Sequence, residues 1–291
     1  MRRCLTLILA VLVLGLSGAL AQNPIKVRVG FNPTQNSDQL RPAAQAIADY
    51  LEQRFNGAIE VEIFIPTEYR GLIEAMRGGN LDFAFFPPDG YVIANADVGA
   101  QVLLKSVRGT SPFYWSAIVV RRDSGIRNVQ GLDGKNIAWV DKNSAAGYVF
   151  PRAAVVGAGL DPDKLFGKQT FAGRHDACVL AVLNKSVDAC ATFANDTRNL
   201  SGAWTQFLKP EEARQLTAIF YSKPIPGDTF SVSRQFFARY PTLSRGIATA
   251  LQGIRTPQSK LLLDLYRIDY MIPAQDSDYN VVREARKVAG Q

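Results

Sequence analysis

The sequence predicts an α/β protein of two lobes, each a mostly parallel sheet flanked by helices. Three observations carry this prediction. Short apolar strands alternate with helical stretches from Lys26 onward, the same order begins again after Tyr114, and a helix-rich tail follows Ser231. A repeated strand–helix–strand order is typical of parallel sheets that are covered by helices on both faces.

The first series of elements follows the first of these observations. Residues 40–55 carry apolar side chains at helical spacing, and the helical stretch 69–77 stops at Gly78 and Gly79. Residues 82–86 are apolar after the first position and lead into Pro87 and Pro88. We expect strands at 26–31, 59–65 and 82–86, and helices at 40–55, 69–77 and directly after residue 88.

The second series repeats this order. We expect strands at 115–120, 136–140, 170–171 and 187–193, and helices at 153–158 and 177–183. Two extended passages, 111–116 and 221–229, separate the series and are candidates for hinge strands. The predicted first lobe comprises residues 22–113 and 224–291, and the predicted second lobe comprises residues 114–223.

The first 21 residues have the form of a cleavable export signal. Arg2 and Arg3 precede an apolar stretch from Leu5 to Leu16, and Ala19 and Ala21 form a small-residue cleavage site. The stretch is shorter than the roughly 20 residues of a membrane anchor. We therefore assign residues 1–21 to a signal peptide and expect a soluble protein of the periplasm.

Composition and charge narrow the classes of partner. Hydrophobic residues make up 47% and charged residues 20% of the chain, as in ordinary globular proteins. Removal of Arg2 and Arg3 with the signal lowers the formal net charge by two, from +7 to +5. A mild positive charge helps to attract small anions, but no basic run indicates nucleic-acid binding. We expect a monomer without a nucleic-acid partner.

Two cysteines, Cys178 and Cys190, remain after the signal is removed. Export permits a disulfide between them, yet both lie where small buried side chains fit. We expect buried free thiols, with the disulfide as the alternative. One histidine and two cysteines do not form a usual metal cluster, so we expect neither a metal nor a cofactor.

Open α/β sheets bind ligands beyond the carboxyl ends of their strands, where helix N-termini point. Ser144 is a good N-cap after the strand 136–140, and Ala145 and Ala146 leave backbone N–H groups open to an oxyanion. We expect a tight first turn over 144–149 and a longer helix from about Pro151. An ordinary capped helix start remains the alternative.

His175, the single histidine, opens the helix after the strand 170–171. The positive end of the helix dipole disfavours a charged imidazole there until an anion arrives. Two roles of His175 remain open: it donates a hydrogen bond to an oxyanion, or it packs in the core or caps the helix.

Three further side chains occupy predicted strand ends or hinges. Tyr69 follows the strand 59–65, and Tyr114 lies at the first predicted hinge. Phenol hydroxyls in a cleft combine neutral donors with an apolar wall, although tyrosines more often serve packing. Asp196 follows the strand 187–193, where its carboxylate would meet a cationic group of a ligand or pair with Arg174.

Five segments stand in a distinctive order along nearly the whole mature chain. They are Glu68–Gly79, Pro88–Tyr91, Tyr114–Gly125, Ser144–Pro151 and His175–Asp188. Together they resemble the phosphonate, phosphite and phosphate solute-binding proteins of ABC importers. The resemblance implies a type II periplasmic-binding-protein fold that closes around a tetrahedral oxyanion.

The resemblance also implies roles for individual residues. Asp196 lies where an acidic residue can meet the amine of an aminophosphonate. The residues implied to hold the oxyanion are Tyr69, Tyr114, Ser144 with the amides of Ala145 and Ala146, and His175. The family's turn typically reads Ser-Thr-Ser-Gly, so Ala145 and Ala146 lack two hydroxyl donors, each worth about 1.5–3 kcal/mol toward a charged group. A smaller, differently charged or non-phosphonate ligand therefore stays open.

Three functional hypotheses follow. The first is capture of a small oxyanion in the periplasm and its delivery to an ABC permease. The second is a sensor of arsenite or another oxyanion that signals to a membrane histidine kinase. The third, an enzyme with a Cys178–His175 dyad, is disfavoured because Val179 and Leu183 surround Cys178 in an apolar stripe.

Overall fold

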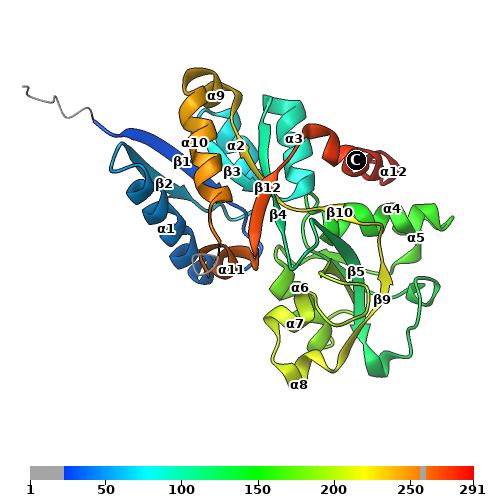
Figure 1. Ribbon diagram of the computed structural model, residues 1–291. Coiled ribbons are helices and arrows are strands. Elements are labelled where there is room, and N and C mark those ends of the chain that lie inside the picture. Colours follow the sequence, from blue (N-terminus) through cyan, green and yellow to red (C-terminus); the bar gives the residue numbers. More distant parts are fainter. Residues whose placement is uncertain (1–22, 256–259) are drawn as a thin grey trace, which may run out of the picture.

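The computed structural model describes residues 23–255 and 260–291. It contains two six-stranded sheets with helices packed against them, and the chain crosses between the sheets (Figure 1). The two-lobed α/β fold predicted from the sequence is confirmed. The predicted signal peptide, residues 1–21, lies outside the described residues. No helix in the described part is long and apolar enough to cross a membrane.

The first sheet has the strand order β12-β4-β11-β3-β1-β2. Its strands are β1 (Ile25–Phe31), β2 (Ile59–Phe64), β3 (Phe83–Phe86), β4 (Gln101–Val107), β11 (Thr229–Val232) and β12 (Tyr270–Pro273). The predicted parallel pairing occurs at β2-β1-β3. The other pairs are antiparallel, because β11 returns from the second sheet in the opposite direction and β4 lies between β11 and β12. The expectation of mostly parallel sheets is therefore wrong in this detail, since both sheets are mixed.

Helices cover both faces of the first sheet. Asn36 caps α1 (Ser37–Arg54) by accepting from the Asp38 N–H at 2.9 Å, a common N-cap arrangement. This helix packs with α10 (Pro241–Gln252) and α11 (Lys260–Tyr266) on one face, where Phe83 and Phe85 contact Phe230. The opposite face carries α2 (Arg70–Arg77) and α3 (Pro88–Val98), and α9 (Arg234–Arg239) follows β11.

The second sheet has the order β10-β5-β8-β6-β7, with β9 also paired to β5. Its strands are β5 (Phe113–Arg121), β6 (Ile137–Trp139), β7 (Gln169–Phe171), β8 (Ala189–Ala194), β9 (Leu216–Tyr221) and β10 (Ile225–Pro226). Pairing is parallel at β7-β6-β8 and antiparallel at β5. Its helices are α4 (Phe150–Gly157), α5 (Pro162–Leu165), α6 (His175–Leu183), α7 (Ala203–Phe207) and α8 (Pro210–Ala213).

Both predicted hinge passages lie where the chain crosses between the sheets, and they lie side by side. Ile225 pairs with Tyr114 in an antiparallel ladder, and the Gly227 N–H donates to the Pro112 carbonyl at 2.9 Å. A Cβ at Gly227 would stand 2.1 Å from the Ser106 carbonyl oxygen, so the close approach of residue 227 to Ser106 requires glycine.

The last helix, α12 (Asn280–Val288), packs against both α3 and α4, so it joins the two halves rather than covering the first alone. In Figure 1 it lies above α4. Arg286 of α12 pairs with the fully buried Asp89 of α3 at 2.7 Å. One core cluster consequently runs from α2 and α3 through α12 to α4.

Cys178 and Cys190 form a disulfide. The expectation of two buried free thiols is therefore wrong. Burial alone does not distinguish the two states, since the cysteines are fully buried as a bridged pair. The bond ties α6 to the neighbouring strand β8, and the sequence does not reveal that these two residues face each other.

Candidate functional site

A cavity of about 50 Å³ lies between the two halves of the molecule. A single buried water occupies about 10–15 Å³ by the same measure, so the cavity has room for about four water-sized groups, the scale of a tetrahedral oxyanion. The first half contributes Asn32, Thr34, Gln35, Tyr69, Pro87, Arg108, Asp228, Leu265 and Tyr266, and the second contributes Tyr114, Ser144, His175, Phe193, Asn195, Gln206 and Phe207.

The two halves meet directly at this cavity. The backbone N–H of His175 donates to the Thr34 carbonyl at 3.3 Å. Thr34 lies in the loop after β1, whereas His175 is the first residue of α6. The structure therefore has the two halves closed on the cavity.

The turn after β6 is wide, whereas the sequence suggested a tight one. Residues Ala145–Val149 form a π-helical turn, in which Val149 donates to Ser144 and Phe150 donates to Ala145. Pro151 has no N–H to donate, and the wide turn leaves the carbonyls of residues 146 and 147 without helical donors. The Ser116 hydroxyl satisfies the first at 2.7 Å, and the Val140 N–H satisfies the second at 3.1 Å.

Ser144 holds the start of this turn. Its hydroxyl oxygen accepts from the Gly147 N–H at 3.0 Å, which leaves the hydroxyl proton free to donate. Position 147 requires glycine, because a Cβ there would stand 2.5 Å from the Cβ of Val140 and 2.9 Å from the Ser144 hydroxyl oxygen. The N–H groups of a first helical turn have no acceptor within the helix. The Ser144 hydroxyl therefore gives this end of the cavity a neutral donor.

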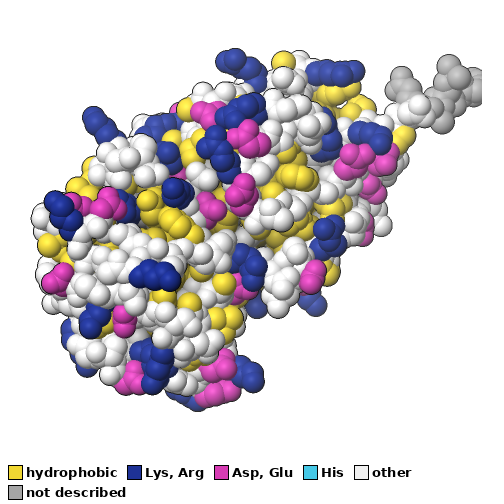
Figure 2. All heavy atoms as spheres, turned by 180° about the vertical axis from the view of Figure 1, so that it is seen from behind, with side chains coloured by type: hydrophobic (Ala, Val, Ile, Leu, Met, Phe, Trp, Pro, Cys, Tyr) yellow, Lys and Arg dark blue, Asp and Glu magenta, His cyan; other side chains and the backbone are white. Residues whose placement is uncertain are grey.

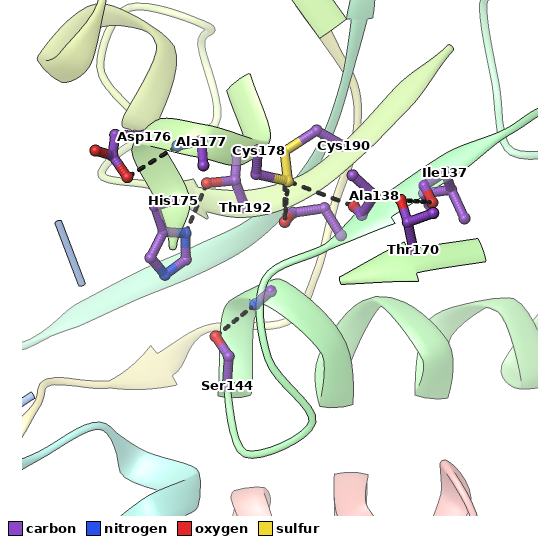
Figure 3. The surroundings of a disulfide bond; sticks show 12 residues. Ile137, Ala138, Ser144, Thr170, His175, Asp176, Ala177, Cys178, Cys190 and Thr192 are labelled. Atoms are coloured by element: carbon purple, nitrogen blue, oxygen red, sulfur yellow. Dashed lines mark hydrogen bonds between the residues drawn. A yellow bond between two sulfur atoms is a disulfide. The ribbon is translucent and has the colours of Figure 1, made fainter. Parts of the chain in front are cut away.

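His175 faces the same space. Figure 3 shows its ring on the side of α6 that faces the Ser144 turn. The Nδ1 atom lies 2.8 Å from the Thr192 hydroxyl of β8, and the ring meets Phe193 edge-on at 5.0 Å between centroids. Burial lowers the pKa of His175 to about 3, so the ring is neutral at physiological pH. No histidine colour appears on the face seen in Figure 2, where acidic and basic side chains are intermixed.

Several polar atoms of the cavity wall lack partners among the described residues. These are the Tyr69 hydroxyl and the amide oxygens of Asn32 and Asn195, all of which are buried. Burial raises the pKa of the Tyr69 and Tyr114 phenols well above the usual value, so both remain proton donors. Buried polar groups normally have hydrogen-bond partners. Unpartnered groups that converge on one cavity therefore indicate a ligand site.

Two charged residues also line the cavity. The Arg108 guanidinium lies 2.7 Å from the Asp228 carboxylate and 5.8 Å from the centroid of the Tyr114 ring. Sequence inspection missed both residues, because they are 120 positions apart and meet only where the chain crosses between the sheets. Thr192 and Asn32 were also missed, and nothing in the local sequence distinguishes either one from a packing residue.

The sequence-predicted site residues occupy three kinds of position. Tyr69, Tyr114, Ser144 and His175 all line the cavity. Ala145 and Ala146 follow Ser144 in the buried turn, and their side chains are not part of the wall. Asp196 does not line the cavity but lies in an adjoining depression that shares Arg108, Asn195 and Gln206 with it, and its carboxylate accepts from the Arg198 N–H at 2.7 Å.

The disulfide removes the predicted catalytic dyad and any binding of arsenite through cysteine thiols. Bonded to Cys190, Cys178 cannot act as a thiolate nucleophile beside His175, and neither sulfur is free to bind arsenite. Among residues 23–255 and 260–291 there is no group of three or more histidine, cysteine or acidic side chains placed to hold a metal ion.

Comparison with known proteins gives a consistent result. Residues 29–279 match the family model of ABC-transporter phosphonate periplasmic substrate-binding proteins. The phosphate-import protein PhnD of Mycolicibacterium smegmatis is 30% identical over 72% of this chain and 67% of its own. The phosphonates-binding periplasmic protein of Escherichia coli is 30% identical over 68% of this chain, which spans only 58% of that relative.

The chain is also similar to a solved structure and to a sensor kinase. A binding-protein component of an ABC phosphonate transporter from Pseudomonas aeruginosa superposes with a TM-score of 0.79 at 22% identity, covering 92% of this chain and 87% of that one. The tetrathionate sensor histidine kinase TtrS of Salmonella typhimurium is 28% identical over 55% of this chain, which spans 28% of the kinase.

Proposed function

The chain belongs to the family of periplasmic substrate-binding proteins of phosphonate ABC transporters, and from this premise we propose that it captures one small oxyanion and delivers it to an ABC permease. The proposed ligand is a phosphonate with a small substituent, phosphite or phosphate. The protein performs no bond chemistry in this role. Its work is selective binding and presentation of a closed, loaded form.

The observation that carries the proposal is the convergence of neutral hydrogen-bond donors on one buried cavity. Tyr69, His175 and Ser144 reach one cavity from three different elements, and the Tyr69 hydroxyl has no hydrogen-bond partner among the described residues. An oxyanion supplies acceptors for all three, and hydrogen bonds to a charged group are worth about 1.5–3 kcal/mol each. The donors are neutral, so the site binds anions through oriented dipoles, as helix N-termini do.

The size of the cavity and its missing hydroxyls limit the ligand. About 50 Å³ leaves little room beyond the tetrahedral group itself. Ala145 and Ala146 supply backbone N–H groups only, so fewer side-chain donors surround the anion than in the family's usual turn. We therefore infer that phosphite, phosphate and methylphosphonate bind better than phosphonates with long substituents.

Binding would be coupled to closure of the two lobes. We assign residues 22–113 and 224–291 to one lobe and 114–223 to the other, with α12 resting on both. A ligand held by donors from both lobes binds the closed form more tightly than the open form. This difference in affinity shifts the equilibrium toward the closed form. The permease would recognise the closed form.

A thermal-shift screen tests this function. The panel contains phosphite, phosphate, methylphosphonate, methanesulfonate and sulfate. A ligand at 100 times its dissociation constant adds about 2.7 kcal/mol, which corresponds to about 5–10 °C for a protein of this size. The matched control is Ser144→Ala, which should reduce the shift. Absence of a shift with every member of the panel would refute the proposal.

A sensor role is the second candidate, supported by the similarity to the tetrathionate sensor kinase. In that case the closed form would dock on a membrane histidine kinase, with the same oxyanion chemistry in the cavity. Uptake of the bound ligand by cells with and without the gene separates the two roles. Unchanged uptake together with altered kinase-dependent transcription would favour sensing.

A further inference from the structure

We propose that the Arg108–Asp228 ion pair makes the cavity selective for oxyanions that carry no cationic substituent. This inference rests on the proposed function and specifies its ligand class. The pair would exclude aminoalkylphosphonates, whose ammonium group needs an available carboxylate, and would accept phosphonates of the same shape with an alkyl group.

Arg108 is held firmly in the cavity wall. Its Nη2 atom donates to Asp228 at 2.7 Å, and Nε and Nη2 lie 3.3 and 3.2 Å from the Tyr266 carbonyl oxygen. Its Nη1 atom lies 3.2 Å from the hydroxyl of Ser106. A guanidinium that is bonded along its whole fork is oriented more strictly than a lysine ammonium would be. The positive charge therefore has a fixed position beside the ligand space.

Asp228 supplies the only carboxylate among the cavity-lining residues of the described chain, and Arg108 already neutralises it. A ligand ammonium would have to displace the guanidinium or sit beside it, and two like charges within a few ångströms repel each other. Asp196, the acidic residue that the sequence suggested as an amine partner, lies in the adjoining depression and not in the cavity wall, and its Oδ1 atom already accepts from the N–H groups of residues 198 and 200.

The rest of the wall suits an apolar substituent. Phe193, Phe207 and Leu265 line the same space without polar side-chain atoms. A hydrogen atom or a short alkyl group on phosphorus can contact these side chains, whereas an ammonium group there would lose its water without gaining a partner. Burial of an unpaired charge is among the most costly events in a protein interior.

The test uses two ligands of nearly identical shape, ethylphosphonate and aminomethylphosphonate, which differ by a methyl group in place of an ammonium group. Calorimetric titration of the wild type should give at least tenfold tighter binding of ethylphosphonate. In Arg108→Gln the carboxylate becomes available, and the ratio of dissociation constants should move at least tenfold toward aminomethylphosphonate. In Arg108→Lys, which keeps the charge, the wild-type preference should persist.

Asp228→Asn provides a second test that leaves the other bonds of Arg108 in place. The cavity then carries an uncompensated positive charge, so ethylphosphonate should bind several-fold tighter while aminomethylphosphonate gains less. Equal wild-type affinity for the two ligands, or an unchanged ratio in both Arg108→Gln and Asp228→Asn, would overturn the proposal. If phosphite binds but neither ethylphosphonate nor aminomethylphosphonate does, the size of the ligand alone decides binding, and the proposal is also overturned. Failure of every oxyanion would instead refute the proposed function.

Discussion

The hydroxyl oxygen of Thr192 lies 2.8 Å from Nδ1 of His175, and both side chains are buried. A neutral imidazole carries one proton, so the group bonded to one ring nitrogen decides what the other can do. When the threonine hydroxyl donates to Nδ1, the proton of the ring resides on Nε2. That tautomer is the one that donates to an oxyanion, and the opposite tautomer would repel it.

Replacing Thr192 with valine should therefore weaken ligand binding without touching the ligand. We expect a loss of about tenfold, equivalent to about 1.4 kcal/mol, because the ring loses the partner that orients it. Thr192→Ser keeps the hydroxyl and should retain most of the affinity. Calorimetry on the ligand identified by the screen measures the effect, and equal losses in the two variants would show that packing rather than the hydroxyl matters.

The Tyr69 hydroxyl should have opposite effects on stability and on binding. It is buried without a partner among the described residues, so Tyr69→Phe removes a polar group that is costly to bury. We expect the unfolding free energy of the ligand-free protein to rise by about 1 kcal/mol while affinity for the oxyanion falls about tenfold.

Tyr91 provides the matched control for this experiment. Its hydroxyl donates to Asp276 at 2.7 Å, and the residue does not line the cavity. Tyr91→Phe should lower stability and leave ligand affinity unchanged. Chemical denaturation gives the unfolding free energy of each variant, and ligand titration gives its affinity. A loss of stability in Tyr69→Phe would contradict the assignment of its hydroxyl to the ligand.

The disulfide should be a measurable part of the stability. It closes a loop with a sequence separation of 12, which the chain-entropy account values at about 3 kcal/mol. The double variant Cys178→Ala, Cys190→Ala should have an unfolding free energy that is lower by that amount, and its denaturation midpoint should fall accordingly. Reductant should shift the wild type toward the variant and leave the variant unaffected, whereas a midpoint insensitive to reductant would argue against the bond.

The burial of His175 predicts a particular pH dependence. Its pKa is lowered from 6.5 to about 3 in the folded protein, so only the unfolded chain binds this proton between those values. The resulting stability is fully present above pH 6.5 and is lost as the pH falls toward 3. Between pH 7 and pH 5 the wild type should lose about 2 kcal/mol relative to His175→Gln, as measured by denaturation at each pH. Parallel pH profiles would indicate that the imidazole titrates normally.

Much of the fold follows from local patterns. The alternation of apolar strands and amphipathic helices predicts the β-α-β units, and strand ends followed by Tyr69, Ser144 and His175 predict where the ligand cavity lies. These features depend on neighbours within a few positions, so a single sequence records them.

Features that depend on distant partners could not be predicted in this way. Arg108 and Asp228 come together because β4 and β11 are adjacent strands, and antiparallel pairing at β11 depends on the return crossing. The disulfide depends on α6 packing over β8. The wide turn at Ala145–Val149 depends on Ser116 of β5, whose hydroxyl donates to the Ala146 carbonyl from 30 positions away.

The bond between the His175 N–H and the Thr34 carbonyl has a consequence for how this protein can diversify. Both atoms belong to the backbone, so any residue at position 34 keeps the acceptor and any residue but proline at position 175 keeps the donor. Mutations that alter the chemistry of the wall thus leave this bridge between the halves intact. Ligand preference can drift through side-chain replacement while the docking geometry of the closed form is inherited unchanged.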